Sequence, residues 1–404
     1  MQPNLQLLNA SNFTPSAHQS IVQPDNRTFA MRMNDFGFKI HREIVKSKEG
    51  NALTSSPSAF FSIAMAYLGA NGNTLEEMKK TLEMPETKKE IHQSLQVLTE
   101  NLSDGKVLNI ASKIFIANWV ELEEDYREEL SNVFKTGPEI VNFKETQNAA
   151  NTINQWAEEK TNSKIKDLVS PNMFNEMTAT ALVNAVYLLA DWKYPFKARD
   201  TWKSTFYLNA EKSINTPMMH KTCDFNHYEN NDFALIELPY KEKEPKQRSL
   251  SMYICLPHEN KNLNDIEIQL SSENLLTWIR STQNRFISLK LPKFAVETTN
   301  PLSKALKNLG MKNAFDDNYA DFSKITSSDE IKISKVIQKA FLKIDEDGTV
   351  ATAATETIMA RPECATISIH KPTNFHVNKP FIFMIIDNMS ETVLFTGKVT
   401  NPAE

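Results

Sequence analysis

The sequence predicts an α+β fold built around a large β-sheet, and two observations support this prediction. Helical periodicity dominates the early part of the chain, apolar strand patterns dominate the late part, and further strands are scattered between them. Of the 404 residues, 41% are hydrophobic and 24% are charged, which is typical of a globular protein with a sizeable core. Chain length alone would suggest two or three domains of about 150 residues each.

The first part of the chain predicts a tail followed by helices. Residues 1–28 are rich in Asn, Gln, Ser and Pro, as flexible tails are. Residues 56–84 predict a buried helix, an Ala-Asn-Gly turn and a second helix capped by Asn73 or Thr74. Residues 29–45 lie between the tail and these two helices, and their apolar residues are spaced three and four apart. This spacing predicts one helix with a buried face formed by Phe29, Met33, Phe36, Ile40 and Ile44.

Strand patterns follow. Residues 107–119 alternate with a period of two, and residues 180–192 are almost entirely apolar, which suits a central strand buried on both faces. Asp387–Asn388 separates two apolar runs and predicts a tight hairpin. Further apolar runs predict strands within residues 234–240, 249–257, 286–297 and 381–399.

Composition excludes several classes of function. The formal net charge of -5 offers no electrostatic attraction to nucleic acid or to an anionic membrane. No apolar run reaches the roughly 18 residues that a membrane-spanning helix needs. The three cysteines form no CxxC pair, which argues against zinc and thioredoxin chemistry. We interpret Cys223 and Cys255 as small core residues, and Cys364 as an exposed thiol or a site of oxidative cross-linking.

Triplets of the N-glycosylation type indicate whether the protein is secreted or cytoplasmic. The start of the chain lacks the apolar segment of a secretory signal. Five Asn-x-Ser/Thr triplets are nevertheless candidate sites for N-glycosylation, at Asn9, Asn12, Asn26, Asn101 and Asn388. We therefore expect a mature secreted glycoprotein whose signal has been replaced by Met1. The alternative is a cytoplasmic protein in which these triplets are unused.

The segment at residues 335–383 is the most informative. An apolar strand ends in the acidic cluster Asp345–Asp347, followed by Gly348 and by seven small or β-branched residues. Alternate members of this run are all small, so it could enter a sheet as a new strand without displacing a packed core. Gly348 would let the backbone change direction at the entry point. The alternative is a linker of small residues.

Seven motifs occur along the chain in a fixed order, at residues 51–74, 180–196, Thr216–Met219, Leu291–Phe294, Glu346–Thr349, 375–383 and 394–402. Through these motifs the chain resembles the serpin family, from about Phe29 to Pro402. The resemblance implies one domain with about nine helices, three β-sheets and an exposed reactive-centre loop at about residues 346–375, which replaces the multi-domain expectation. It further implies an inhibitory, extracellular animal protein.

The family's mechanism implies that a protease attacks the loop and forms an acyl-enzyme, after which the cleaved loop inserts into the main sheet and traps the enzyme. The chain itself would be no enzyme, and it lacks GxSxG, HExxH and phosphate-loop motifs. We expect a monomer whose partner is a target protease, with no cofactor and no metal. Lys88 and Lys89 start a helix that then turns neutral, so no heparin-binding stripe is expected.

Three groups of residues carry over from the family. The hinge comprises Glu346, Gly348, Thr349, Val350, Ala351, Thr352, Ala353, Ala354 and Thr355. Its small residues match inhibitory members rather than carriers, although Val350 replaces a common glutamate and is expected to face outward. The shutter, a hydrogen-bonded cluster beneath the opening strands, comprises Ser55, Ser58, Asn184 and Gln338, where Gln338 replaces the usual histidine. The breach, at the top of the sheet, comprises Trp192, Lys293 and Glu346, with an expected Lys293–Glu346 ion pair.

Family spacing places the cleaved bond fourteen residues after Gly348, at Pro362–Glu363. Arg361 would suit a trypsin-like protease, but the following proline makes that bond a poor substrate. Met359–Ala360 and Ala360–Arg361 are alternatives, which suit papain-like cysteine proteases or elastase-like and chymotrypsin-like serine proteases. We rank a serine protease target first, a cysteine protease second, and a non-inhibitory carrier or chaperone third.

Overall fold

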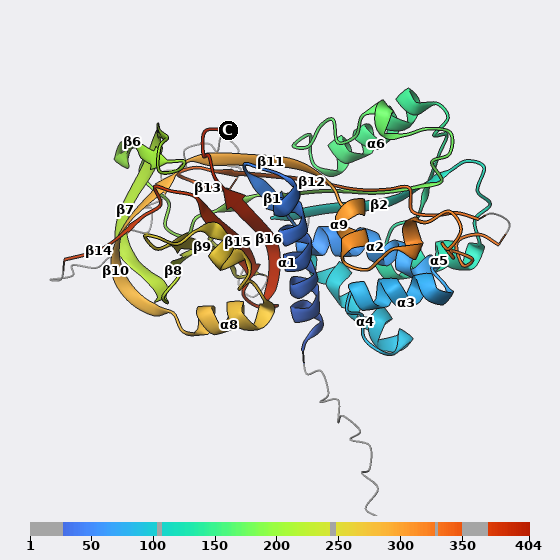
Figure 1. Cartoon of the computed structure of the whole chain (residues 1–404), viewed down its shortest axis with the longest axis horizontal. Helices are drawn as coiled ribbons and strands as arrows, with labels where there is room; N and C mark the ends of the chain where they lie inside the picture. The colour runs from blue at the N-terminus through green and yellow to red at the C-terminus, as the bar shows by residue number, and fades with distance from the viewer. Residues whose placement is uncertain (1–26, 103–106, 243–247, 328–329, 350–370) are drawn as a thin grey trace, which may run out of the picture.

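The computed structural model describes residues 27–102, 107–242, 248–327, 330–349 and 371–404 (Figure 1). Within these ranges the chain forms nine α-helices and sixteen strands. The predicted α+β class is therefore confirmed. The described hinge residues Gly348 and Thr349 lie at one end of the seven-stranded sheet described below.

The first helix, α1 (Phe29–Ser47), buries its predicted apolar face. The Thr28 hydroxyl caps it by accepting a hydrogen bond from the Met31 amide, and Arg27 pairs with Asp35 at 2.9 Å. Arg27 and Thr28, the last two residues of the expected tail, thus make defined contacts with α1. Ionic and capping contacts fix these residues although their composition resembles that of a tail.

The second helix, α2 (Ser56–Gly69), is buried at every residue, as its apolar sequence predicts. The predicted start of α3 (Gly72–Thr81) is wrong by two residues, because the N-cap position is Asn71 rather than Asn73 or Thr74. Gly72 adopts a left-handed φ of 51°, which lets the helix begin directly after the turn. The remaining helices are α4 (Lys88–Leu102), α5 (Glu124–Phe134), α6 (Thr146–Lys160), α7 (Leu263–Glu267), α8 (Ser272–Arg280) and α9 (Ser303–Asn308).

One sheet carries the candidate site. Its strand order is β3 (Glu139–Val141), β2 (Leu108–Ala117), β4 (Thr180–Leu188), β12 (Lys335–Ile344), β13 (Gly348–Thr349) and β5 (Ala190–Asp191), and β11 (Phe294–Pro301) also pairs with β12. Every residue of β4 is buried, as predicted for a central strand. Helix α2 packs against β2 and β4, and α6 packs on the opposite face of β2 (Figure 1).

The other strands form a nine-stranded network with two parts. One part contains β1 (Ala52–Thr54), β16 (Thr392–Val399), β15 (Phe381–Asp387), β9 (Leu250–Pro257) and β8 (Phe233–Pro239). The other contains β6 (Thr201–Tyr207), β10 (Gln283–Pro292) and β14 (Thr373–His376). The long β7 (Ser213–Glu229) pairs with strands of both parts, which explains how the expected three sheets become two continuous networks.

The hairpin predicted at Asp387–Asn388 is present but is not tight. Strand β15 ends at Asp387 and β16 begins at Thr392, so residues 388–391 connect them. Glu391 takes the left-handed conformation, with a φ of 54°, that closes this longer connection. The turn residues thus mark where the first strand ends, whereas the full connection depends on Glu391.

Candidate functional site

In the seven-stranded sheet, which is the main sheet of the site, β4 and β12 are paired along the middle and are separated by another strand at one end. Strands β4 and β12 pair directly in parallel from Ala181↔Lys335 to Tyr187↔Phe341. Beyond that point, β13 lies between β12 and β5, with Thr349 opposite both Ile344 and Ala190. Gly348 and Thr349, near the start of the predicted loop, have therefore entered the sheet, whereas β4 and β12 pair directly with each other below them.

Gly348 is required by close packing at this entry point. A Cβ atom at Gly348 would lie 2.1 Å from the Ala190 carbonyl oxygen and 2.8 Å from the Asp191 Cα. Both contacts are with backbone, which cannot rotate away as a flexible side chain could. The Gly348 carbonyl also accepts a hydrogen bond of 3.0 Å from the Asp345 amide, which closes the turn into β13.

Thr349 is anchored by an aromatic pair. Its hydroxyl and that of Tyr240 lie 2.7 Å apart and share a hydrogen bond. The Tyr240 ring stacks on Trp192 with a centroid distance of 4.4 Å and an interplanar angle of 10°. Trp192 in turn donates from its indole nitrogen to the Asp345 carbonyl at 3.0 Å. Burial raises the pKa of Tyr240 above its ordinary value, so the phenol stays neutral and available as a hydrogen-bond partner.

Glu346 joins the loop base to two strands. Its carboxylate receives a 2.6 Å ion pair from Lys293 Nζ, as the resemblance implies, and a 2.9 Å hydrogen bond from the Thr201 hydroxyl. Burial alone would raise the pKa of Glu346, but the hydrogen bonds from Lys293 and Thr201 hold it below its ordinary value. The carboxylate therefore stays ionised and ties the start of the loop to β6 and to Lys293, which lies between β10 and β11.

The four shutter residues are brought together, but in two separate sets. Asn184 and Gln338 lie directly opposite each other on β4 and β12. Ser58 donates to Asn184 at 2.8 Å, and Asn184 donates to Ser62 at 3.0 Å. Gln338 instead bonds to the backbone of Ser55, accepting from its amide at 3.1 Å and donating to its carbonyl at 2.9 Å. The two opening strands are thus each fastened to the start of α2.

Replacing Asn184 with alanine is expected to destabilise the closed sheet by about 2–4 kcal/mol, because Ser58 and Ser62 would keep buried hydroxyls without this partner. Urea unfolding followed by circular dichroism measures the change. The matched control is Asn151→Ala on the exposed face of α6, which should shift stability by less than about 0.5 kcal/mol. A shift at Asn184 no larger than that of the control would contradict the role assigned to this cluster.

A row of three basic side chains crosses β7, β10 and β14, of which β14 follows the predicted loop. His220 of β7, Lys290 of β10 and His376 of β14 lie directly opposite one another in register. Burial, followed by the charges of Lys290 and His376, lowers the pKa of His220 to about 4, while Asp200 acts in the opposite direction. Burial and Lys290 also lower the pKa of His376. The native arrangement therefore favours neutral imidazoles.

Acid is expected to weaken the anchoring of β14. The unfolded chain binds protons at these histidines near pH 6.5, whereas folded His220 does so only near 4, so stability falls as the pH drops between those values. Urea unfolding at about pH 7 and about pH 5 measures the loss for the native chain and for His220→Gln. The variant should lose less stability than the native chain. Equal losses would show that His220 does not contribute, and that other buried histidines such as His41, whose pKa burial lowers to about 3, account for the whole effect.

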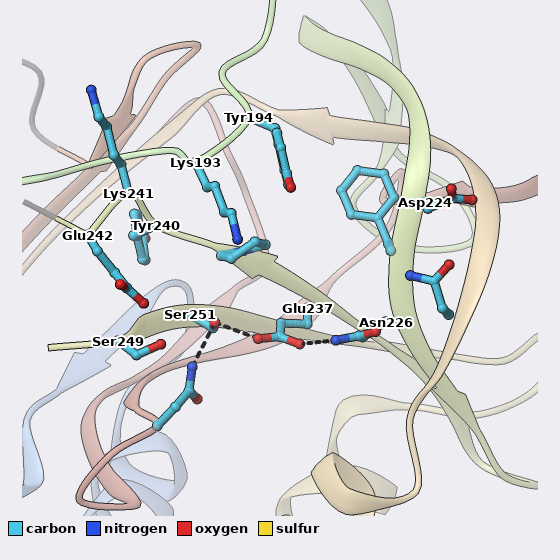
Figure 2. A pocket seen from close by; sticks show the side chains of 14 residues that line it. Lys193, Tyr194, Asp224, Asn226, Glu237, Tyr240, Lys241, Glu242, Ser249 and Ser251 are labelled. Atoms are coloured by element: carbon cyan, nitrogen blue, oxygen red, sulfur yellow. Dashed lines mark hydrogen bonds between the residues drawn. The ribbon is translucent and has the colours of Figure 1, made fainter. Parts of the chain in front are cut away.

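A polar cavity of about 550 Å³ adjoins the residue that holds Thr349 (Figure 2). Tyr240 lines it, together with Glu237, which accepts from Ser251 at 2.6 Å and from Asn226 at 2.7 Å. Asn388 donates from its side-chain amide to Ser251 at 3.0 Å. Glycosylation at Asn388 stays a prediction, because that nitrogen has a second hydrogen to lose to a glycan.

Several predicted residues lie outside the described ranges: Asn9, Asn12, Asn26, Val350, Ala351, Thr352, Ala353, Ala354, Thr355, Met359, Ala360, Arg361, Pro362, Glu363 and Cys364. Asn101 lies in the last turn of α4. Cys223 and Cys255 are buried in β7 and β9. Cys255 is a free thiol, as expected of a small core residue, whereas Cys223 is disulfide-bonded, so its interpretation as a simple core residue is incomplete. Among the described residues no acidic, histidine or cysteine cluster could hold a metal ion. No helix in the described part of the chain is both long and apolar enough to cross a membrane.

Sequence reasoning missed Ser62, Tyr240 and also Thr201, which donates to Glu346. Ser62 lies one helical turn after Ser58, so the i, i+4 spacing on α2 could have indicated it. Tyr240 meets Thr349 across 109 positions of sequence, and no local pattern signals that contact.

Comparisons with known proteins agree on one family. The family described as "Serpin (serine protease inhibitor)" matches residues 31–402. An uncharacterised serpin-like protein of Thermococcus kodakarensis is 32% identical, covering 92% of this chain and 85% of its own. Serpin A3-8 of Bos taurus is 31% identical, covering 97% of this chain and 93% of its own. The crystal structure of Serpin48, described as a highly specific serpin of the insect Tenebrio molitor, has a TM-score of 0.81 and 30% identity, covering 94% of this chain and 99% of its own.

Proposed function

The chain belongs to the serpin family, and from that premise we propose that it inhibits a protease as a suicide pseudo-substrate. The observation that carries the proposal is the sheet closed between β4 and β12 with Gly348 and Thr349 already entered at one end. This arrangement leaves a place for one further strand and fixes where that strand would begin.

Insertion would extend the contacts that Thr349 already makes. Thr349 is buried and faces Tyr240. Side chains alternate along a strand, so a strand continuing from Thr349 would direct Ala351, Ala353 and Thr355 toward the same face. All three are small enough to enter a packed core. Val350 would face the other way, where its apolar side chain causes no clash with the core beneath the sheet.

The protease supplies all the chemistry in this proposal. Its nucleophile attacks one loop peptide bond, the amine of the downstream residue leaves, and the upstream loop remains as an acyl-enzyme. Insertion between β4 and β12 then pulls the bound protease along before water can release it. The native sheet is metastable because the closed β4–β12 pairing lacks the hydrogen bonds of the additional strand.

The target class and the cleaved bond are finer proposals. We favour a serine protease, cleaving at Pro362–Glu363, because family spacing from Gly348 places the bond there. Met359–Ala360 and Ala360–Arg361 are the alternatives that would suit a papain-like cysteine protease. We further propose that the chain is a secreted monomer and no enzyme, with its five Asn-x-Ser/Thr triplets as candidate glycosylation sites.

A protease panel tests the inhibitory function. Trypsin-like, chymotrypsin-like, elastase-like and papain-like enzymes are each mixed with the chain, and residual activity, denaturing gels and the mass of the released C-terminal fragment are recorded. A denaturant-stable complex with a serine enzyme is expected, and the fragment mass identifies the bond. Loss of papain-like activity would instead assign the cysteine class. Cleavage by every enzyme with no lost activity would overturn inhibition and leave a carrier or chaperone role.

A further inference from the structure

The polar cavity of Figure 2, which we name the Tyr240 cavity, forms where several strand ends meet. Its described lining residues belong to β7, β8, β9 and β10 and to the connections that follow β5, β8 and β15. Its volume of about 550 Å³ lies within the range of small-molecule sites. The cavity is therefore large enough for a ligand of one or two rings.

The floor of the Tyr240 cavity is a fixed row of polar side chains. Glu237 of β8 accepts hydrogen bonds from Asn226 of β7 at 2.7 Å and from Ser251 of β9 at 2.6 Å (Figure 2). Ser251 in turn accepts from Asn388 at 3.0 Å. A carboxylate offers about four acceptor sites, so Glu237 can also accept hydrogen bonds from a ligand.

The opposite wall of the cavity offers donors. Figure 2 shows the polar ends of Lys193 and Tyr194 directed toward the floor. Lys193 Nζ lies 5.6 Å from the centroid of the Tyr194 ring, and within the described chain neither polar end has a hydrogen bond or an ion pair. A ligand between floor and wall would therefore meet acceptors on one side and donors on the other.

The charges of the lining nearly cancel. The cavity is lined by two ammonium groups and three carboxylates, which belong to Lys193, Lys241, Asp224, Glu237 and Glu242. A ligand with a strong charge of either sign would meet like charges in the cavity, which disfavours its binding. This lining suits a neutral ligand whose groups both donate and accept hydrogen bonds, and hydroxyl groups do both.

Aromatic rings complete the lining. Tyr194, Phe225 and Tyr240 all contribute, and such rings offer apolar surface on which the C–H groups of a sugar ring can pack. We propose that the Tyr240 cavity binds a neutral saccharide of one or two rings. The hydroxyl groups of the saccharide donate to Glu237 and accept from Lys193, while its C–H face packs on Tyr194.

The saccharide can come from two sources. Asn388 lines the cavity and begins the triplet Asn388-Met389-Ser390, so the first two rings of an N-linked glycan would enter the cavity from its own floor. The other source is a saccharide carried by a second molecule. Both sources present the same neutral, hydroxylated rings.

The Tyr240 cavity is joined to the inserted hinge. The hydroxyl groups of Tyr240 and Thr349 share a hydrogen bond of 2.7 Å. The Lys241 amide donates to the Asp191 carbonyl at 2.7 Å, at the place where β5 pairs with β13. By linkage, a bound saccharide and a hinge inside the sheet stabilise each other. An effect of the saccharide on inhibition rests on the proposed function, whereas its binding does not.

Calorimetric titration of the full, unglycosylated chain from a bacterial host tests the site, with di-N-acetylchitobiose as the neutral disaccharide. We expect saturable binding, and a loss of about tenfold in affinity in Lys193→Ala/Tyr194→Ala. The matched control Lys203→Ala/Tyr207→Ala removes the same two residue types at exposed positions of β6 outside the cavity, and it should bind as the native chain does. No saturable binding, equal losses in both double variants, or tighter binding of a sulfated disaccharide would overturn the site.

A second preparation, from animal cells, distinguishes the two sources. The peptide that contains Asn388 is analysed by mass spectrometry, and the titration is repeated. A glycan on Asn388 together with lost binding of the disaccharide assigns the chain's own glycan as the occupant. Retained binding assigns a saccharide of another molecule.

The variant Gly348→Val tests the coupling, because its new Cβ would meet the Ala190 carbonyl and expel the hinge. The unglycosylated variant should bind the disaccharide more weakly than the native chain. Unchanged affinity together with altered tryptophan fluorescence would overturn the coupling while the site stands. All these titrations are made without a protease, so failure of the proposed inhibition would leave the binding result valid on its own.

Discussion

Cleavage of the reactive-centre loop is expected to raise the midpoint of thermal unfolding by about 15 °C or more. An inserted strand of about a dozen residues would add ladder hydrogen bonds worth roughly 1 kcal/mol each. For large domains each kcal/mol shifts the midpoint by about 2 °C. The measurement is a thermal melt by circular dichroism before and after limited proteolysis within residues 350–370.

The variant Ala353→Arg provides the control for this melt. It retains the loop as a substrate but would place a long charged side chain on the face that Thr349 already directs into the core. Cleavage of this variant should leave the midpoint unchanged and should inactivate no protease. An unchanged midpoint in the native chain as well would contradict insertion.

Replacing Gly348 with valine is expected to expel the hinge from the sheet. The new Cβ would lie 2.1 Å from the Ala190 carbonyl oxygen, so β13 cannot keep its pairing with β5. The hydrogen bond between Thr349 and Tyr240 would be lost with it, and the change in the Trp192 environment should appear as altered tryptophan fluorescence. We expect inhibition to fall by at least about tenfold, because insertion would start without Gly348 and Thr349 in place.

Thr349→Ser is the matched control for this prediction, because it keeps both the hydroxyl and the small size. It should leave fluorescence and inhibition close to those of the native chain. A Gly348→Val chain with native fluorescence and full inhibition would show that the close packing at Ala190 relaxes without consequence.

Local pattern predicted those elements whose signal lies within a short stretch of sequence. The apolar face of α1 and the continuously buried β4 follow from periodicity and composition alone. The cap of α3 was misplaced because Asn71, Asn73 and Thr74 are all good capping residues, and tertiary contacts decide among them. Asn71 is held by its amide, which donates to the Asp321 carbonyl at 2.9 Å.

In the candidate site, too, some features could be predicted from the sequence and others depend on tertiary contacts. Lys293 and Glu346 were indicated through the family resemblance, and the structure places them 2.6 Å apart. The partial entry of the loop could not be predicted, because it depends on pairing between segments that are distant in sequence. Thr349 meets Ala190 and Tyr240, and neither contact leaves a mark on the residues around Gly348. Packing across the sheet, rather than propensity, determines this state.

The glutamine at position 338 has a consequence for how the molecule responds to an acidic surrounding. The centre of the sheet is fastened through Gln338 and Asn184, and an amide side chain carries no titrating proton. The end of the loop is followed by β14, whose His376 lies in the acid-sensitive row with His220. Acidification would therefore affect β14 before it affects the contacts of Gln338 and Asn184. The pairing of β14 with β10 would weaken first, while β4 and β12 would stay paired.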